Sequence, residues 1–273
     1  EEASFSMVAA PKQKGLDYSL MKTKIKGKEI KGLSSSVIYG PNAAGKTNII
    51  GAMDVLRAIV LRGNIRNSEE KSSPNPAASA LELIPNNNES EAKPVCFEIE
   101  FYEEDGEEHK FKIHYKLKID LGTFLEEEYQ RKILAEVLEV NGERIFERKE
   151  DLKVENLKVI KDYLSDITEQ NAGSINEIAK NSLNQEELFL TNGFKLIFSP
   201  KFTKLIVDWF ANKFMVIYRA DAIKVMRKFA NPKENTVYIE RTLTDAAKAF
   251  GVRSNALGYR QAADSDDVSL CSI

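Results

Sequence analysis

The chain has 273 residues, of which 42% are hydrophobic and 30% charged, and its net charge is −3 at pH 7. This length allows one large domain or two small ones, and the charge balance excludes the overall basic surface of a dedicated nucleic-acid-binding protein. Only Cys96 and Cys271 are present, far apart and without zinc-ligand spacing, which excludes a disulfide scaffold. No apolar run approaches the roughly 18 residues of a membrane span, and no signal-peptide pattern is present, so we expect a cytoplasmic protein.

Two short strands are expected near the N-terminal end, over Ala3–Ala10 and Tyr18–Ile25. A turn around Pro11 to Gly15 would join them. With Val37 to Tyr39 they predict a first sheet, whose central strand leads into a glycine-rich loop. The chain begins at Glu1 rather than at Met, and we expect it to be part of a longer protein.

The glycine-rich loop lies within the run SVIYGPNAAGKTNII, residues 36–50. Gly40, Gly45, Lys46 and Thr47 match the pattern G-x-x-x-x-G-K-[ST], the Walker A motif of phosphate-binding loops. An apolar run enters the loop and a helix-compatible run, Asn48 to Leu61, leaves it, so the match has the strand, loop and helix context that the motif requires. A glycine-rich turn alone would explain neither the lysine nor the threonine.

Each residue type in this loop has a chemical reason. The two glycines permit backbone angles at which successive N–H groups surround a phosphate, and the helix adds the positive end of its dipole. Lys46 would lie beside the β- and γ-phosphates, and the Thr47 hydroxyl would bind Mg²⁺, so these two are the catalytic candidates and Thr47 is the metal ligand. The expected ATP-binding residues are Gly40, Pro41, Asn42, Ala43, Ala44, Gly45, Lys46, Thr47 and Asn48.

The region after the predicted helix changes in composition. Residues 63–94 are rich in Asn, Ser, Glu and Pro, with a brief apolar interval at Leu81 to Ile84. This pattern indicates a long polar surface excursion. It serves either as a solvated connector or as a lid or partner-binding loop.

Two antiparallel hairpins are predicted next. Val95–Tyr102 and Lys110–Ile119 alternate between apolar and polar residues, as strands with one solvent-facing side do. Ile133–Val140 and Arg144–Glu147 form the second hairpin, turned at Asn141-Gly142, a dipeptide typical of type I′ turns. Residues 124–140 also have helix propensity, but the Asn-Gly turn favours a strand for their second half.

Beyond Lys149 the pattern is mostly helical. We predict helices over 152–164, 175–189 and 199–211, then a buried strand over 214–218 and a short helix over 242–250 that Gly251 ends. This predicts an N-terminal ATPase lobe with an antiparallel β-subdomain over 1–149, and a mostly helical insertion over 150–273.

The loop alone does not distinguish the classes of phosphate-loop proteins. The N-K-x-D motif of GTPases is absent, and no apolar strand ends in Asp-Glu, the Walker B acids. Asp221 follows the apolar run at 214–218 but has no Glu after it, and we interpret it as a loop acid. His109 and His114 lie on a predicted hairpin and are interpreted as strand residues rather than catalytic bases.

The order of these features resembles a family. A short β-meander, the run SVIYGPNAAGKTNII, a polar excursion, hairpins of FEIEFY type and a helical part with Asp208, Trp209 and Phe210 resemble the N-terminal half of ABC/SMC/RecF-like AAA ATPases of bacterial abortive-infection and anti-phage systems. The OLD-type and PARIS-type ATPases are similar in this layout. The resemblance implies an α/β P-loop NTPase fold of ABC/RecF type, with an antiparallel β-meander and a helical insertion.

The resemblance also implies an ATP site shared between two subunits. The family's Walker B acids, signature motif and switch histidine belong to a C-terminal lobe that this sequence does not contain, and Gln130 is a candidate for its Q-loop glutamine. We therefore expect a homodimer or higher oligomer around Mg-ATP. ATP would act as a switch in anti-phage defence that controls an effector, a nuclease or a toxin. Two alternatives stay open: an ATP-gated scaffold with little turnover, and a RecF-like DNA-repair ATPase that binds duplex DNA.

Overall fold

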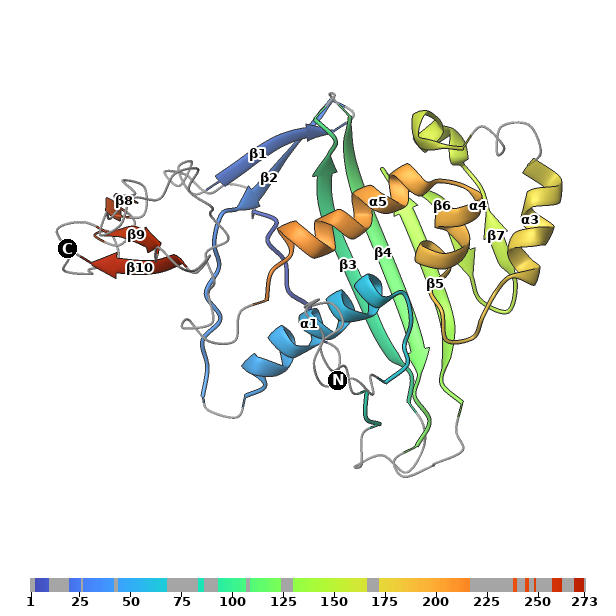
Figure 1. The fold of residues 1–273 in the computed structure, drawn as a ribbon, viewed down its shortest axis with the longest axis horizontal. Coiled ribbons are helices and arrows are strands. Elements are labelled where there is room, and N and C mark those ends of the chain that lie inside the picture. The colour runs from blue at the N-terminus through green and yellow to red at the C-terminus, as the bar shows by residue number, and fades with distance from the viewer. Residues whose placement is uncertain are drawn as a thin grey trace. The chain divides into compact units, whose positions relative to one another are not determined.

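The computed structural model divides the chain into two units, Glu1–Val216 and Ile217–Ile273, which are considered separately. Figure 1 shows the fold. The structure describes residues 3–9, 20–25, 27–41, 44–67, 83–85, 93–106, 109–123, 130–165, 172–216, 238–239, 244–245, 248, 257–261 and 268–272. At 172–175, 238–239, 257, 259, 261 and 268–272 only the backbone is described. The division into an ATPase lobe over 1–149 and a helical insertion over 150–273 stays a prediction. Helices from beyond this residue pack on the sheet of the first unit.

The first unit is built on a five-stranded sheet in the order β3-β4-β5-β6-β7, and each neighbouring pair is antiparallel. The strands are β3 Val95–Glu104, β4 Lys110–Asp120, β5 Lys132–Val140, β6 Glu143–Arg148 and β7 Leu152–Val154. Both predicted hairpins are thus confirmed, and they join into one sheet. Asn141 and Gly142 have φ values of 55° and 84°, as the type I′ turn requires.

The two faces of this sheet differ in polarity. In β4, the side chains of Phe111, Ile113, Tyr115, Leu117 and Ile119 are buried, whereas the residues between them face outward. On the outer face, carboxylates of β3 pair with lysines of β4: Glu98 with Lys116 at 3.2 Å, and Glu100 with Lys112 at 2.7 Å. One face therefore belongs to the core and the other to solvent.

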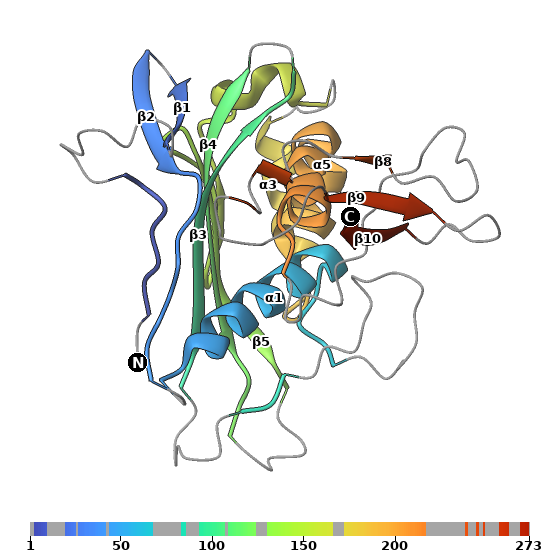
Figure 2. The same ribbon diagram turned by 90° about the vertical axis from the view of Figure 1, so that its left-hand side faces the viewer.

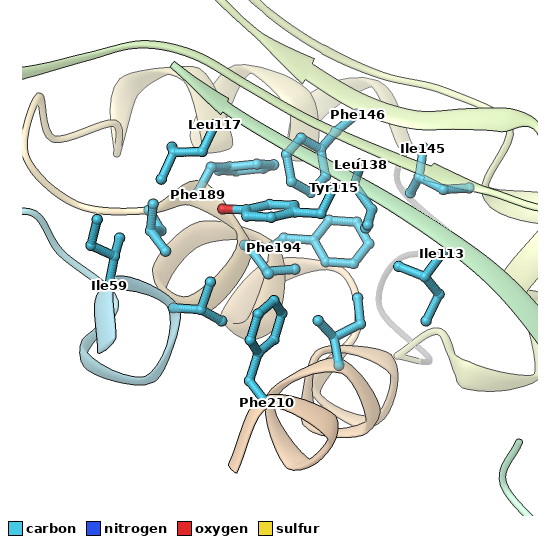
Figure 3. Packing of buried hydrophobic residues seen from close by; sticks show 14 of the residues in the cluster. Ile59, Ile113, Tyr115, Leu117, Leu138, Ile145, Phe146, Phe189, Phe194 and Phe210 are labelled. Atoms are coloured by element: carbon cyan, nitrogen blue, oxygen red, sulfur yellow. The ribbon is translucent and has the colours of Figure 1, made fainter. Parts of the chain in front are cut away.

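The helices of the first unit cover the apolar face of the sheet. Figure 2 shows α1 (Lys46–Arg62) and α5 (Pro200–Asp208) on the same side of the strands. Fully buried aromatic and aliphatic side chains fill the space between helices and sheet, as Figure 3 shows. They include Ile59 of α1, Tyr115 of β4, Phe146 of β6, Phe189, Phe194 and Phe210. Phe146 and Phe189 meet edge to face, with ring centroids 5.0 Å apart.

Two predicted helices agree closely with the structure. The helix after the loop is α1, 17 residues long, which ends at Gly63 in the left-handed conformation. The helix predicted over 199–211 is α5, continued by a π-helix, η5, over Trp209–Lys213. Ser199 caps α5 by accepting a hydrogen bond from the Phe202 N–H, and Pro200 stands at its first position.

Other predictions beyond Lys149 are wrong in part. The helix predicted over 152–164 is the edge strand β7 followed by a 3-10 helix, η3, over Leu157–Tyr163. The helix predicted over 175–189 is α3, Ala172–Asn181, after which the chain leaves helical structure. A π-helix, η4, then covers Phe189–Phe194, and a single turn, α4, covers Lys195–Ile197. Pairing of β7 with β6, and hydrogen bonds from the Phe189 and Leu190 N–H groups to the buried Glu136 carboxylate, override local helix propensity in these segments.

The N-terminal part forms a small sheet of its own. β1 (Leu20–Ile25) and β2 (Lys28–Leu33) form a hairpin, and residues 7–9 hydrogen bond to β2 through the Ala9 N–H and the Met7 carbonyl. β1 confirms the strand predicted over Tyr18–Ile25, and β2 was not predicted. The strand predicted over Ala3–Ala10 is wrong for the described residues 3–9, where Val8 forms only an isolated bridge to Gly32. The turn predicted around Pro11 to Gly15 lies outside the described residues.

The second unit contains a three-stranded antiparallel sheet in the order β10-β9-β8. The strands are β8 Tyr238–Ile239, β9 Leu257–Gln261 and β10 Val268–Ser272. Thr244, Asp245 and Lys248 are helical, within the range predicted as a short helix. The other residues of that range, and Gly251, are not among those described.

Candidate nucleotide-binding site

The Walker A run brings its functional residues to the N-terminal end of α1. Gly45 precedes the helix with φ 80° and ψ 10°, a left-handed conformation that a residue with a Cβ rarely adopts. The first turn of α1 has no acidic residue and no side-chain cap. The first-turn N–H groups and the positive end of the helix dipole therefore face the loop, and no carboxylate of the first turn neutralises them. This arrangement suits the binding of a phosphate.

The Lys46 side chain folds back over the loop. Its Nζ donates to the carbonyl oxygen of Gly40 at 2.8 Å and to that of Pro41 at 2.6 Å. The Ala44 N–H donates to the Pro41 carbonyl at 3.3 Å, which helps to close the loop. The ammonium thus lies within the curve of the loop, held by two neutral acceptors. Phosphate oxygens are stronger acceptors for an ammonium than carbonyls are, because both partners are then charged.

The residues present fit a nucleoside triphosphate with Mg²⁺. Among the described residues, a Cβ at Gly40 would meet only the Ala44 Cβ, at 3.9 Å. Thr47 and Asn48 are exposed on the first turn of α1, so the Thr47 hydroxyl is accessible to a cation. Among the described residues, no group of three or more His, Cys, Asp or Glu side chains is arranged to hold a metal ion. At the described loop, the Thr47 hydroxyl would hold Mg²⁺ together with phosphate oxygens and water.

Not every predicted site residue can be placed. Asn42 and Ala43, in the middle of the loop, are not described, and neither is Asp221. Gln130 is exposed just before β5, and nothing in the structure tests it as a Q-loop residue. The roles of the Walker A residues in binding phosphate and Mg²⁺ stay predictions.

The strand predicted to enter the loop is wrong for the described structure. Residues 35–40 have no strand pairing, and Val37, Ile38 and Tyr39 are 81%, 43% and 91% exposed. An apolar run becomes a buried strand only beside other strands, and the described strands do not pair with it. The strand predicted over 214–218 is also wrong where it is described, since residues 214–216 are not in a strand and Met215 is 62% exposed.

Both histidines lie on or beside the hairpin, as predicted. His114 is held between two carboxylates on the outer face, with Nδ1 3.0 Å from Glu139 Oε2 and Nε2 2.9 Å from Glu98 Oε1. Burial lowers the pKa of His114, but the hydrogen bonds to Glu139 and Glu98 outweigh burial and leave its pKa raised. His109 lies 3.7 Å from Asp105 and 3.9 Å from Asp162.

Two features of the first unit were not predicted. Arg57 of α1 donates to main-chain carbonyls of η5, and Glu136 of β5 is a fully buried carboxylate. Arg57 stands four residues after Met53 and three before Val60, so it lies on the same face of α1 as these apolar residues. This spacing could have predicted that Arg57 faces the protein interior. Glu136 gave no such signal, because the exposed glutamates of the strands alternate with apolar residues in the same way.

Comparison with known proteins provides a match to a family model. Residues 35–169 match the model of a family described as AAA domain, putative AbiEii toxin, Type IV TA system. The match supports an AAA-type P-loop ATPase family. It begins just before the glycine-rich loop and runs through α1 and the five-stranded sheet, and the mixed α/β fold with antiparallel sheets fits a P-loop NTPase. No curated protein and no solved structure matches the chain.

No described helix is both long enough and apolar enough to cross a membrane.

Proposed function

We propose that this AAA-type domain binds and hydrolyses ATP, and that ATP acts as a switch in bacterial anti-phage defence. The observation that carries the proposal is the Walker A geometry: a lysine ammonium inside a loop that is closed by Gly45 and followed by a 17-residue helix. The family description, with its putative AbiEii toxin and toxin–antitoxin context, supports the defence role. We also propose that the domain is an ATPase of ABC or RecF type rather than of another AAA type.

In the proposed mechanism, the chain's own residues bind and orient the triphosphate. Lys46 leaves the carbonyls of Gly40 and Pro41 for the β- and γ-phosphate oxygens, and the first-turn N–H groups of α1 donate to the same phosphates. The Thr47 hydroxyl would hold Mg²⁺, which supplies positive charge to the phosphate oxygens when bound. We expect a further lobe or a second subunit to supply the acids that position the attacking water.

The proposed assembly places ATP between two subunits, in a homodimer or a higher oligomer. ATP binding would hold the subunits together, and hydrolysis would release them, so that an associated nuclease or toxin is controlled by the nucleotide state. No membrane partner is proposed.

A DNA-binding ATPase of RecF type is the alternative that a specific observation favours. In the β1–β2 hairpin, Lys22 pairs directly with Lys31, and Lys24 lies two residues along on the same face. Three lysines on one face of a hairpin can contact a phosphate backbone, although Glu29 lies beside Lys31, at 3.3 Å. Duplex binding that weakens steeply with salt, and that Lys22→Glu with Lys31→Glu abolishes, would favour this alternative.

Steady-state ATP turnover of the intact protein tests the proposal. We expect hydrolysis that Lys46→Ala abolishes, with Lys28→Ala, an exposed lysine of the β1–β2 hairpin, as the matched control. ATP binding without measurable turnover would instead indicate an ATP-gated scaffold that holds an effector.

A further inference from the structure

Arg57 connects the Walker A helix to the end of the α5–η5 helix. It lies eleven residues after Lys46 on α1, about 16 Å along the helix at 1.5 Å per residue. Its Nε donates to the Phe210 carbonyl at 2.9 Å, and its Nη2 donates to the Ala211 carbonyl at 3.3 Å. Carbonyls near a helix C-terminus lack helical partners and attract cations. Arg57 therefore fixes the position of this helix end relative to α1.

The residue beside these carbonyls is Trp209, the only tryptophan of the chain. Its ring stacks on Phe101 of β3, with centroids 3.9 Å apart and planes at 19°, and on Phe214, at 5.1 Å and 15°. Stacking between aromatic rings depends steeply on their offset and angle. A small shift of η5 would therefore change the environment of the Trp209 indole.

The two halves of α1 are held differently. Thr47, Asn48 and Ile50 in the first turns are exposed, whereas Leu56, Ile59 and Val60 belong to the core. The C-terminal end of α1 is also held, by the η4 segment. The Gly63 carbonyl accepts a hydrogen bond from the Leu188 N–H at 2.9 Å and another from Asn192 Nδ2 at 3.0 Å. A displacement at the loop would thus pass along α1 as a rigid element to Arg57.

We propose that Arg57 is a positioning residue that couples nucleotide occupancy of the loop to the conformation of residues 209–216. The proposal rests on the ATP binding proposed above. When Lys46 leaves its carbonyl acceptors for phosphate, the N-terminal turns of α1 adjust, and Arg57 carries that adjustment to the Phe210 and Ala211 carbonyls. The first unit ends at Val216, directly after this segment, so the nucleotide signal arrives where the chain leaves the unit.

Tryptophan fluorescence and calorimetry of the intact protein, measured in parallel, test this coupling. Calorimetry reports Mg-ATP binding independently of the fluorescence. Trp209→Phe identifies the part of the emission that comes from Trp209. In the wild type, we expect a saturable change of Trp209 emission as ATP is added. In Arg57→Ala, this change should be lost while the ATP affinity stays within about threefold of the wild type. A threefold difference is smaller than the roughly 5-fold change at the lower end of typical coupling between two sites. Arg57→Lys should restore part of the change, because an ammonium can donate to one of the two carbonyls.

The matched control is Arg144→Ala, which removes an arginine that pairs with Glu139 and Glu147 on the outer face of the sheet. It should leave the emission change intact. If Arg57→Ala does not fold, Arg57→Gln, which keeps one amide donor, takes its place. A full emission change in the folded Arg57 variant, or ATP binding by the wild type without any emission change, overturns the coupling alone. Absence of ATP binding in calorimetry removes the proposed function, and the coupling with it.

Discussion

The Tyr115 hydroxyl donates a hydrogen bond to the Glu136 carboxylate at 2.9 Å, in a part of the core where neither side chain has any exposed surface. The same carboxylate accepts from the main-chain N–H groups of Phe189 at 2.6 Å and Leu190 at 2.9 Å. Glu136 therefore serves as an acceptor for the start of η4 and ties this helical segment to the middle of the sheet.

Tyr115→Phe should destabilise the protein by about 1–3 kcal/mol, because it removes a donor from a buried carboxylate that stays behind. Denaturant unfolding measures the loss. Tyr102→Phe is the matched control, since the Tyr102 hydroxyl donates to Glu100 at 3.4 Å in an exposed position. Equal losses in the two variants would show that burial of the Tyr115–Glu136 hydrogen bond is unimportant.

Gly63→Ala should be costly for two reasons. Gly63 has φ +74°, and an added Cβ would lie 2.6 Å from Thr191 Oγ1. The left-handed conformation and the overpacking together should cost about 2–5 kcal/mol in the free energy of unfolding.

Gly142→Ala separates the two contributions. Gly142 has φ +84° but nothing within 4 Å of a Cβ, so only the backbone strain of about 1–2 kcal/mol applies. The same unfolding measurement on both variants should give a clearly larger loss at Gly63. A larger loss at Gly142 would contradict the close packing of α1 against the 188–194 segment.

The raised pKa of His114 predicts a pH dependence of stability. A histidine whose pKa is higher in the folded than in the unfolded state stabilises the fold fully below its unfolded pKa, near 6.5, and this contribution is lost as the pH rises through the folded pKa. The free energy of unfolding should therefore fall by less than about 1 kcal/mol as the pH rises from 6 into the alkaline range, the loss beginning near 6.5.

His114→Gln should remove this dependence, whereas His109→Gln should keep it, as pH-dependent denaturant unfolding of both variants will show. An unchanged pH profile in His114→Gln would mean that the Glu98–His114–Glu139 arrangement does not set it.

Thr47→Ala should weaken the Mg²⁺-dependent part of ATP binding. With Mg²⁺ present, we expect a loss of about 10-fold or more in affinity, equivalent to one charge-assisted contact of about 1.4 kcal/mol. In EDTA, the variant and the wild type should bind ATP alike. A loss of the same size in EDTA would show that Thr47 affects the loop rather than the metal.

Local signals predicted much of the sheet and of the loop. Asn141-Gly142 fixed the β5–β6 turn because two successive positive φ values suit few other residues, and the alternation in β4 fixed its buried face. Gly45, Lys46 and α1 were placed correctly because the motif, the turn and the helix are all encoded within a few residues of one another.

Long-range contacts explain what could not be predicted. Val37 to Tyr39 have strand composition, but a strand needs neighbours, and local sequence does not supply them. Residues 182–188 have helical propensity, yet buried groups bind their backbone: Arg148 donates to the Glu187 carbonyl at 2.6 Å. Arg57 and Glu136 gained their roles only when segments far along the chain packed against them.

Titration calorimetry of the intact protein with Mg-ATP measures nucleotide binding by the loop itself. We predict that the wild type and Lys28→Ala bind ATP with equal affinity, and that Lys46→Ala loses about 10-fold to 100-fold, as expected for one charge-assisted phosphate contact of about 1.5–3 kcal/mol. No binding by the wild type, or equal binding by Lys46→Ala, would show that this loop does not hold the phosphates of ATP.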